Sequence, residues 1–197
     1  AEARTWARDL VSAAAAGERE ALARLLDDAP VNEDASLERL LCVDAELSAS
    51  WTNVTCVGAA ALNGHAATLE VLLAKRADPN IKCQNASSWD GAFTLTQRDT
   101  PLCLAAKKGH RACVETLLRA RADPNVQCNS EYLEGAVEWG EDDDGTETMF
   151  YSALDVANMA KQPEIAELIG KGGGTKLAQP SNQPRRKMVS SGNRMGA

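Results

Sequence analysis

The chain has 197 residues, of which 44% are hydrophobic and only 4% aromatic, and its formal net charge is −7. This composition supports a packed core and excludes a largely disordered chain. No run of about 18 consecutive apolar residues occurs, so no transmembrane helix is predicted.

The charge is distributed unevenly along the chain. Residues 172–197 contain no acidic residue and five basic ones, so residues 1–171 carry −12. The basic residues are Lys176, Arg185, Arg186, Lys187 and Arg194. An acidic body argues against nucleic-acid binding, which requires clustered Lys and Arg. We expect Arg185, Arg186 and Lys187 to contact a partner, with a nuclear-targeting signal as the alternative.

The amino-terminal part of the chain indicates a first, weak helical unit, and stronger copies follow. At an offset of 45 residues, Gly64-His65 coincides with Gly109-His110, and the sequence RADPN at 76–80 recurs unchanged at 121–125. A further copy occupies 152–169, and the weak copy occupies 10–32. Such a repeat predicts stacked supersecondary units.

Each unit contains the signals of two short helices, and in three of the four units a glycine joins them. Thr100 is a predicted N-cap and Pro101 a predicted first helical residue. Gly17, Gly64 and Gly109 are placed to end the first helix with a positive φ. The second helix has apolar residues at spacings of three and four, and Asp-Pro-Asn forms the closing turn.

This pattern resembles the ankyrin repeat, in which a Thr-Pro-Leu-His start leads into two antiparallel helices and a β-turn. The resemblance implies an all-α solenoid of helix-turn-helix units with extended finger loops. The chain departs from the pattern where Cys103 and Asp155 replace the usual His and where Gly58 stands at that position. Lys161 replaces the glycine that ends the first helix, which costs about 1 kcal/mol in a left-handed conformation.

We expect residues 1–171 to form the repeat domain and residues 172–197 a basic flexible tail. The repeats lie near 5–32, 51–80, 99–125 and 150–171, and the inserted loops are 33–50, 81–98 and 126–149. An ankyrin repeat leaves about eight steps between one turn and the next helix start, whereas this chain has 23, 20 and 27. Insertions on one side of a solenoid are typical of its binding face.

Most aromatic residues lie in or beside the insertions. They are Trp51, Trp89, Phe93, Tyr132, Trp139, Phe150 and Tyr151. One interpretation is that the loops fold these side chains back onto the helices as small satellite cores. The other is that some of them anchor a partner, because Trp and Tyr are enriched at binding hot spots. We select Trp89, Phe93, Tyr132 and Trp139 as candidate partner-binding residues.

The third insertion is acidic. Its acidic residues are Glu131, Glu134, Glu138, Glu141, Asp142, Asp143, Asp144 and Glu147. Asp142, Asp143 and Asp144 are candidates for docking a basic partner, and a solvated charge run is the alternative. A calcium loop requires alternating ligands, which Asp142-Asp143-Asp144-Gly145 lacks, so no metal site is predicted.

The six cysteines contain no CxxC pair, which argues against a zinc ribbon or a thioredoxin-type site. Free thiols in a reducing compartment are expected, with Cys103 and Cys113 as small buried side chains. Cys83 and Cys128 occupy equivalent positions in neighbouring repeats, roughly 10 Å apart and beyond disulfide reach. A thiol sensor is the alternative hypothesis for these cysteines.

The sequence offers few candidates for catalytic residues. The only histidines, His65 and His110, occupy a slot that is structural in the family, so no catalytic triad and no cofactor site are predicted. We therefore expect a non-catalytic protein-protein interaction module that binds a protein partner through its finger loops, concave face and basic tail. A regulatory enzyme domain would need a pocket of convergent titratable groups.

The alternative function is a stably integrated accessory subunit of a large protein complex, for example one attached peripherally to an organellar membrane. The chain begins at Ala1 rather than at a methionine, which weakly favours this alternative. An intracellular location is expected. The compartment is the cytoplasm or, if the amino terminus is a processed end, an organelle interior.

Overall fold

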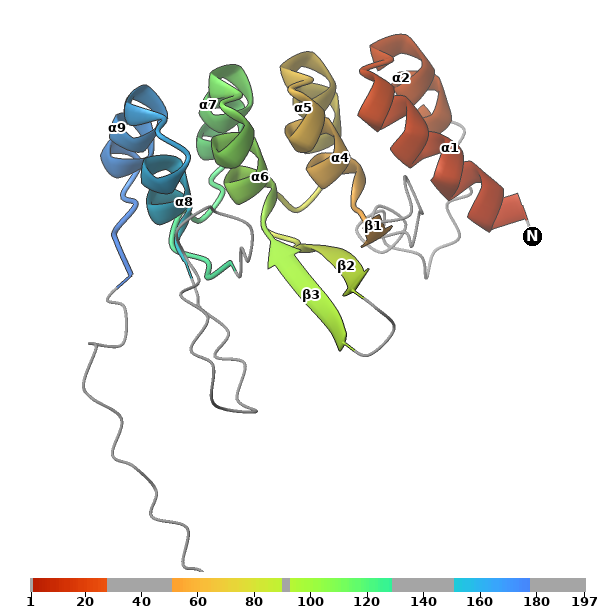
Figure 1. The fold of residues 1–197 in the computed structure, drawn as a ribbon. Coiled ribbons are helices and arrows are strands. Elements are labelled where there is room, and N and C mark those ends of the chain that lie inside the picture. Colours follow the sequence, from red (N-terminus) through yellow and green to blue (C-terminus); the bar gives the residue numbers. More distant parts are fainter. Residues whose placement is uncertain (1, 28–50, 90–92, 129–150, 178–197) are drawn as a thin grey trace, which may run out of the picture.

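The computed structural model describes residues 2–27, 51–89, 93–128 and 151–177. Within these residues, four antiparallel helix pairs stack side by side into a solenoid (Figure 1). The pairs are α1 (Glu2–Ala16) with α2 (Arg19–Asp27), α4 (Cys56–Asn63) with α5 (Ala66–Ala74), α6 (Pro101–Lys108) with α7 (Arg111–Arg119), and α8 (Ala153–Met159) with α9 (Pro163–Lys171). The expected all-α repeat architecture is confirmed.

The first helices of the later pairs are capped by hydroxyl residues, including Thr100 as predicted. The side chains of Thr55, Thr100 and Ser152 each accept a hydrogen bond from the amide three residues later, at 3.0, 3.2 and 3.2 Å. Asp155 completes a capping box, because its carboxylate accepts a hydrogen bond from the Ser152 amide at 3.0 Å. The residue that replaces the usual histidine in the fourth repeat is therefore part of the helix cap.

The first helices end in left-handed residues. Gly17, Gly64 and Gly109 have φ angles of 76°, 81° and 80°, as the sequence predicts. Lys161 occupies the same place in the fourth repeat with a φ of 56°. The backbone of Lys161 therefore adopts the left-handed conformation that glycine adopts at lower energy in the other repeats, because glycine has no Cβ.

The core lies between neighbouring helix pairs and consists mainly of alanine and leucine. Helix α4 is buried along almost its whole length through small side chains, including Ala59, Ala60 and Ala61. These small side chains let α4 approach α1 on one side and α6 on the other. Leu69 and Leu117 on the second helices are fully buried and fill the space between the layers.

The two histidines connect successive repeats. His65 donates from Nε2 to the carbonyl oxygen of Ala15 at 3.0 Å, and His110 donates in the same way to Leu62 at 3.1 Å. Each acceptor lies at the end of the first helix of the preceding pair. The histidines therefore satisfy helix-terminal carbonyl groups across the repeat boundary, which is a structural role.

A small antiparallel sheet extends from the helices. It contains β1 (Trp51–Asn53), β2 (Cys83–Trp89) and β3 (Phe93–Asp99) in the order β1-β2-β3. Strands β2 and β3 form a hairpin that projects beyond the helical stack (Figure 1). The second insertion is thus a β-hairpin carried by a helical solenoid.

Candidate functional site

The base of each finger is a buried residue pair at the edge of the helical stack. We use "finger" for the segment between an Asp-Pro-Asn turn and the next first helix. The second finger begins at Cys83 and ends at Asp99, and the third begins at Cys128 and ends at Tyr151. All four residues are at most 4% exposed. The fingers are therefore anchored in the core and not merely attached to its surface.

The second finger brings two of the predicted partner-binding residues together. The pairing register runs from Cys83 opposite Asp99 to Trp89 opposite Phe93. Trp89 and Phe93 thus lie opposite each other at the far end of the hairpin from the helices (Figure 1).

The third finger is closed at its base by a backbone bridge. The Cys128 amide donates to the Tyr151 carbonyl oxygen at 2.8 Å, and the Tyr151 amide donates back at 2.7 Å. Tyr151 is 4% exposed, and burial raises the pKa of its hydroxyl, to which the nearby Asp155 carboxylate adds. This aromatic residue of an insertion therefore belongs to the core.

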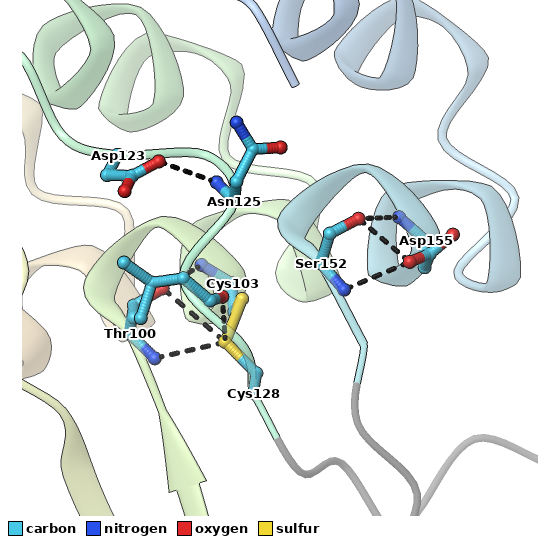
Figure 2. The surroundings of a disulfide bond; sticks show 8 residues. Thr100, Cys103, Asp123, Asn125, Cys128, Ser152 and Asp155 are labelled. Atoms are coloured by element: carbon cyan, nitrogen blue, oxygen red, sulfur yellow. Dashed lines mark hydrogen bonds between the residues drawn. A yellow bond between two sulfur atoms is a disulfide. The ribbon is translucent and has the colours of Figure 1, made fainter. Parts of the chain in front are cut away.

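A disulfide joins Cys103 on α6 to Cys128, with the two Cα atoms 7.1 Å apart (Figure 2). The expectation of free thiols is wrong for this pair, and Cys103 is not merely a small buried side chain. Cys128 does not pair with its counterpart Cys83 in the neighbouring repeat. The bond forms instead within the third repeat, because the chain turns back after α7 and brings Cys128 against the start of α6.

Asp99 is a buried carboxylate that sequence reasoning missed. It is 2% exposed, and within the described residues its Oδ1 atom accepts no hydrogen bond. Burial raises its pKa from 3.8 to about 6, against the opposing attraction of Lys107 and Lys82. The sequence does contain a signal of this difference. The residue before the helix cap is charged in the third repeat, whereas it is the uncharged Val54 in the second repeat and Tyr151 in the fourth.

The segment after α9 closes the fourth repeat. The Asn125 side-chain oxygen accepts from the Thr175 amide at 2.9 Å and hydroxyl at 2.8 Å, and its amide donates to the Gly173 carbonyl oxygen at 3.1 Å. One repeat earlier, Asn80 accepts from the Asp123 amide at 2.8 Å. Thr175 therefore takes the place of the next repeat's aspartate, and residues 172–177 pack on the solenoid.

We expect Asn125→Ala to destabilise the fold by about 1–2 kcal/mol, because three hydrogen bonds to the terminal segment are lost at a partly exposed site. Asn80→Ala removes the single bond to Asp123 and is the matched control, with a cost of about 1 kcal/mol or less. Urea unfolding measures both free energies, and amide exchange at Thr175 reports detachment of the segment. Unchanged exchange at Thr175 in Asn125→Ala would contradict the assignment.

The other predicted partner-binding residues lie outside the described residues and remain predictions. They are Tyr132, Trp139, Asp142, Asp143, Asp144, Arg185, Arg186 and Lys187. In the described ranges, no group of three or more His, Cys, Asp or Glu side chains is arranged to hold a metal ion. No helix in these ranges combines the length and apolar character required to cross a membrane.

These features define a helical repeat scaffold that carries a projecting β-hairpin. A family model described as ankyrin repeats (3 copies) matches residues 10–128 and again residues 59–176. The chain therefore belongs to the ankyrin-repeat family, whose repeats generally mediate protein-protein interaction and are typically non-catalytic. A comparison with curated proteins found no significant match.

Proposed function

We propose that this protein is a non-catalytic binding module that holds a protein partner with its fingers and the adjoining face of α4, α6 and α8. The observation that carries the proposal is the β2–β3 hairpin, which projects from a buried base (Figure 1). A finger with a rigid base loses less conformational entropy when it binds than a flexible loop does. Aromatic residues at such a tip match the usual composition of binding hot spots.

The proposal also includes the candidates of the third finger and of the basic cluster near the end of the chain. Tyr132 and Trp139 belong to the third finger, and Asp142, Asp143 and Asp144 give that finger a negative charge suited to a basic partner surface. The basic cluster Arg185–Lys187 belongs to the terminal segment and offers the opposite charge. The proposed partner is thus a protein with an apolar site flanked by basic groups.

The proposal predicts that replacing Trp89, Phe93, Tyr132 and Trp139 together with alanine weakens partner binding at least about tenfold, since a hot-spot residue commonly contributes 2 kcal/mol or more. The tagged full chain and this variant are used as baits in the source extract, and the captured proteins are quantified by mass spectrometry. Partners are those enriched on the wild-type chain and depleted on the variant. Equal capture by both baits would overturn the finger assignment.

A matched control is available on the second helices. Glu70 on α5 and Arg119 on α7 form an exposed ion pair, with 3.6 Å between the guanidinium nitrogen and the carboxylate oxygen. An exposed pair contributes little to stability, so Glu70→Ala with Arg119→Ala leaves the fold intact. This double variant is expected to retain the partners. The native size of the captured species then separates a transient binding module from a stable subunit of a large complex.

A further inference from the structure

The Cys103–Cys128 disulfide links the start of a core helix to the base of the third finger. Cys103 lies in the first turn of α6, and Cys128 is the first residue of the third finger (Figure 2). The bond therefore ties the finger base to the helix that the same repeat contributes to the core. Both cysteines are at most 1% exposed, so the bond is enclosed while the finger base is closed.

The second repeat shows the same arrangement without the bond. Gly58 takes the place of Cys103, and Cys83 takes the place of Cys128. A Cβ added to Gly58 would overlap the Cys83 sulfur, so this sulfur also lies against the first turn of its helix. The position of a finger-base sulfur against the first helix is thus common to both repeats, and the third repeat has Cys103 where the second has Gly58.

The hydrogen bonds around the two sulfur atoms agree with this comparison. Cys83 Sγ lies 3.4 Å from the Thr55 hydroxyl oxygen, and Cys128 Sγ lies 3.6 Å from the Thr100 hydroxyl oxygen. The Thr100 amide also donates to Cys128 Sγ at 3.5 Å. Each sulfur therefore keeps a polar contact with the helix cap, and a reduced Cys128 has the same neighbour that Cys83 has.

Backbone pairing is described at the base of both fingers. The second finger has a ladder of seven residue pairs from Cys83 opposite Asp99 to Trp89 opposite Phe93. The described residues of the third finger provide one bridge pair, Cys128 with Tyr151. In the third repeat, the disulfide therefore lies directly beside the backbone pair that is described at the finger base.

We propose that Cys103 and Cys128 form a thiol–disulfide switch that controls how firmly the Cys128–Tyr151 bridge is held against α6. The disulfide form has a closed base, and the dithiol form has a base that opens more often. This inference concerns the conformation of the chain itself and does not depend on partner binding.

Oxidised glutathione is the two-electron oxidant in the proposed thiol–disulfide exchange. A thiolate of the pair attacks oxidised glutathione, forms a mixed disulfide and releases one reduced glutathione. The second thiolate then attacks the mixed disulfide at the protein sulfur and releases another. Two thiol protons are lost, and the protein's two electrons reduce one oxidised glutathione. A dithiol reductant reverses both steps, and opening of the Cys128–Tyr151 bridge gives it access to the sulfur atoms.

Cys113 is expected to take no part in this exchange and serves as an internal control. It is buried in α7, and burial raises the pKa of its thiol to about 11, which suppresses the reactive thiolate. Cys113→Ser is therefore expected to leave the redox response unchanged. Cys103→Ala and Cys128→Ser each remove the response, and the use of two variants guards against loss of folding in one.

The test measures amide hydrogen exchange in the full chain after equilibration with oxidised glutathione or with a dithiol. Peptide mapping is expected to find Cys103 linked to Cys128 only in the oxidised sample. Reduction is expected to accelerate exchange at the Cys128 and Tyr151 amides at least about tenfold, with little change in the β2–β3 ladder. In Cys103→Ala, exchange at these amides is fast under both conditions.

Two outcomes would overturn the proposal. One is the absence of a Cys103–Cys128 link at any ratio of oxidised to reduced glutathione. The other is a link that forms but leaves exchange at Cys128 and Tyr151 unchanged, which would make the bond a passive crosslink. Loss of partner binding by the finger variants has no bearing on either outcome, so the two proposals fail separately.

Discussion

Replacing Gly64 with alanine is expected to destabilise the fold by about 2–4 kcal/mol. Gly64 has a φ of 81°, where a residue with a Cβ costs roughly 1–2 kcal/mol. An added Cβ would also lie 2.8 Å from the His110 ring, which is held against the preceding repeat by its bond to Leu62. The ring cannot move away without losing that bond, so the overlap adds a further cost of about 1–2 kcal/mol.

Gly173 provides the matched control for the backbone component alone. Its φ is 90°, but no atom lies within 4 Å of the position of an added Cβ. Gly173→Ala is therefore expected to cost about 1–2 kcal/mol. Urea unfolding measures both variants, and the double variant Gly64→Ala with His110→Ala should cost less than the sum of its parts. Equal losses of unfolding free energy in Gly64→Ala and Gly173→Ala would show that the contact with His110 adds no cost.

Replacing Asp99 with asparagine is expected to stabilise the fold at pH 7 by about 1–3 kcal/mol. Burial raises the pKa of this carboxyl from 3.8 to about 6, so the folded state binds the proton more tightly than the unfolded chain. One pKa unit corresponds to about 1.4 kcal/mol, and a neutral amide avoids the cost of ionising the buried group. Asparagine keeps the size and shape of the side chain.

The sign of the pH dependence follows from the direction of this pKa change. The contribution of Asp99 is fully present below pH 3.8 and is lost as the pH rises through about 6. The difference in unfolding free energy between Asp99→Asn and the wild-type chain should therefore be near zero at pH 4. It should grow between pH 4 and 6 and stay constant above about pH 6.5.

Urea titrations of both proteins at several pH values measure this difference. Asp99→Val copies Val54 of the preceding repeat and should behave similarly, since it also removes the buried charge. A constant advantage across the whole range would show that ionisation of Asp99 is not its source.

The cost of Asp99 is of interest because of its place at the finger base. A buried carboxylate without a partner on one oxygen is rare in a structural position. It lies at the end of the β2–β3 hairpin that we propose as a binding finger. If Asp99→Asn stabilises the fold but weakens partner binding, the charge has been retained for function.

The sequence alone determined the repeat architecture and most of its local geometry. The cap at Thr100 and the left-handed conformation of Gly17, Gly64 and Gly109 were predicted and are observed. These features depend on interactions within one or two helical turns. Residue type and spacing therefore specify them without knowledge of the remaining chain.

Only the tertiary structure decided what happens at the finger bases and at the end of the solenoid. The Cys103–Cys128 bond, the burial of Asp99 and the contact of Thr175 with Asn125 join segments that are distant in sequence. Insertions of different lengths shift the spacing between repeats, and Gly173-Gly174-Thr175 takes the place of Arg-Ala-Asp in the last one. Such contacts depend on how the chain returns to its own helices, and residue patterns do not encode that return directly.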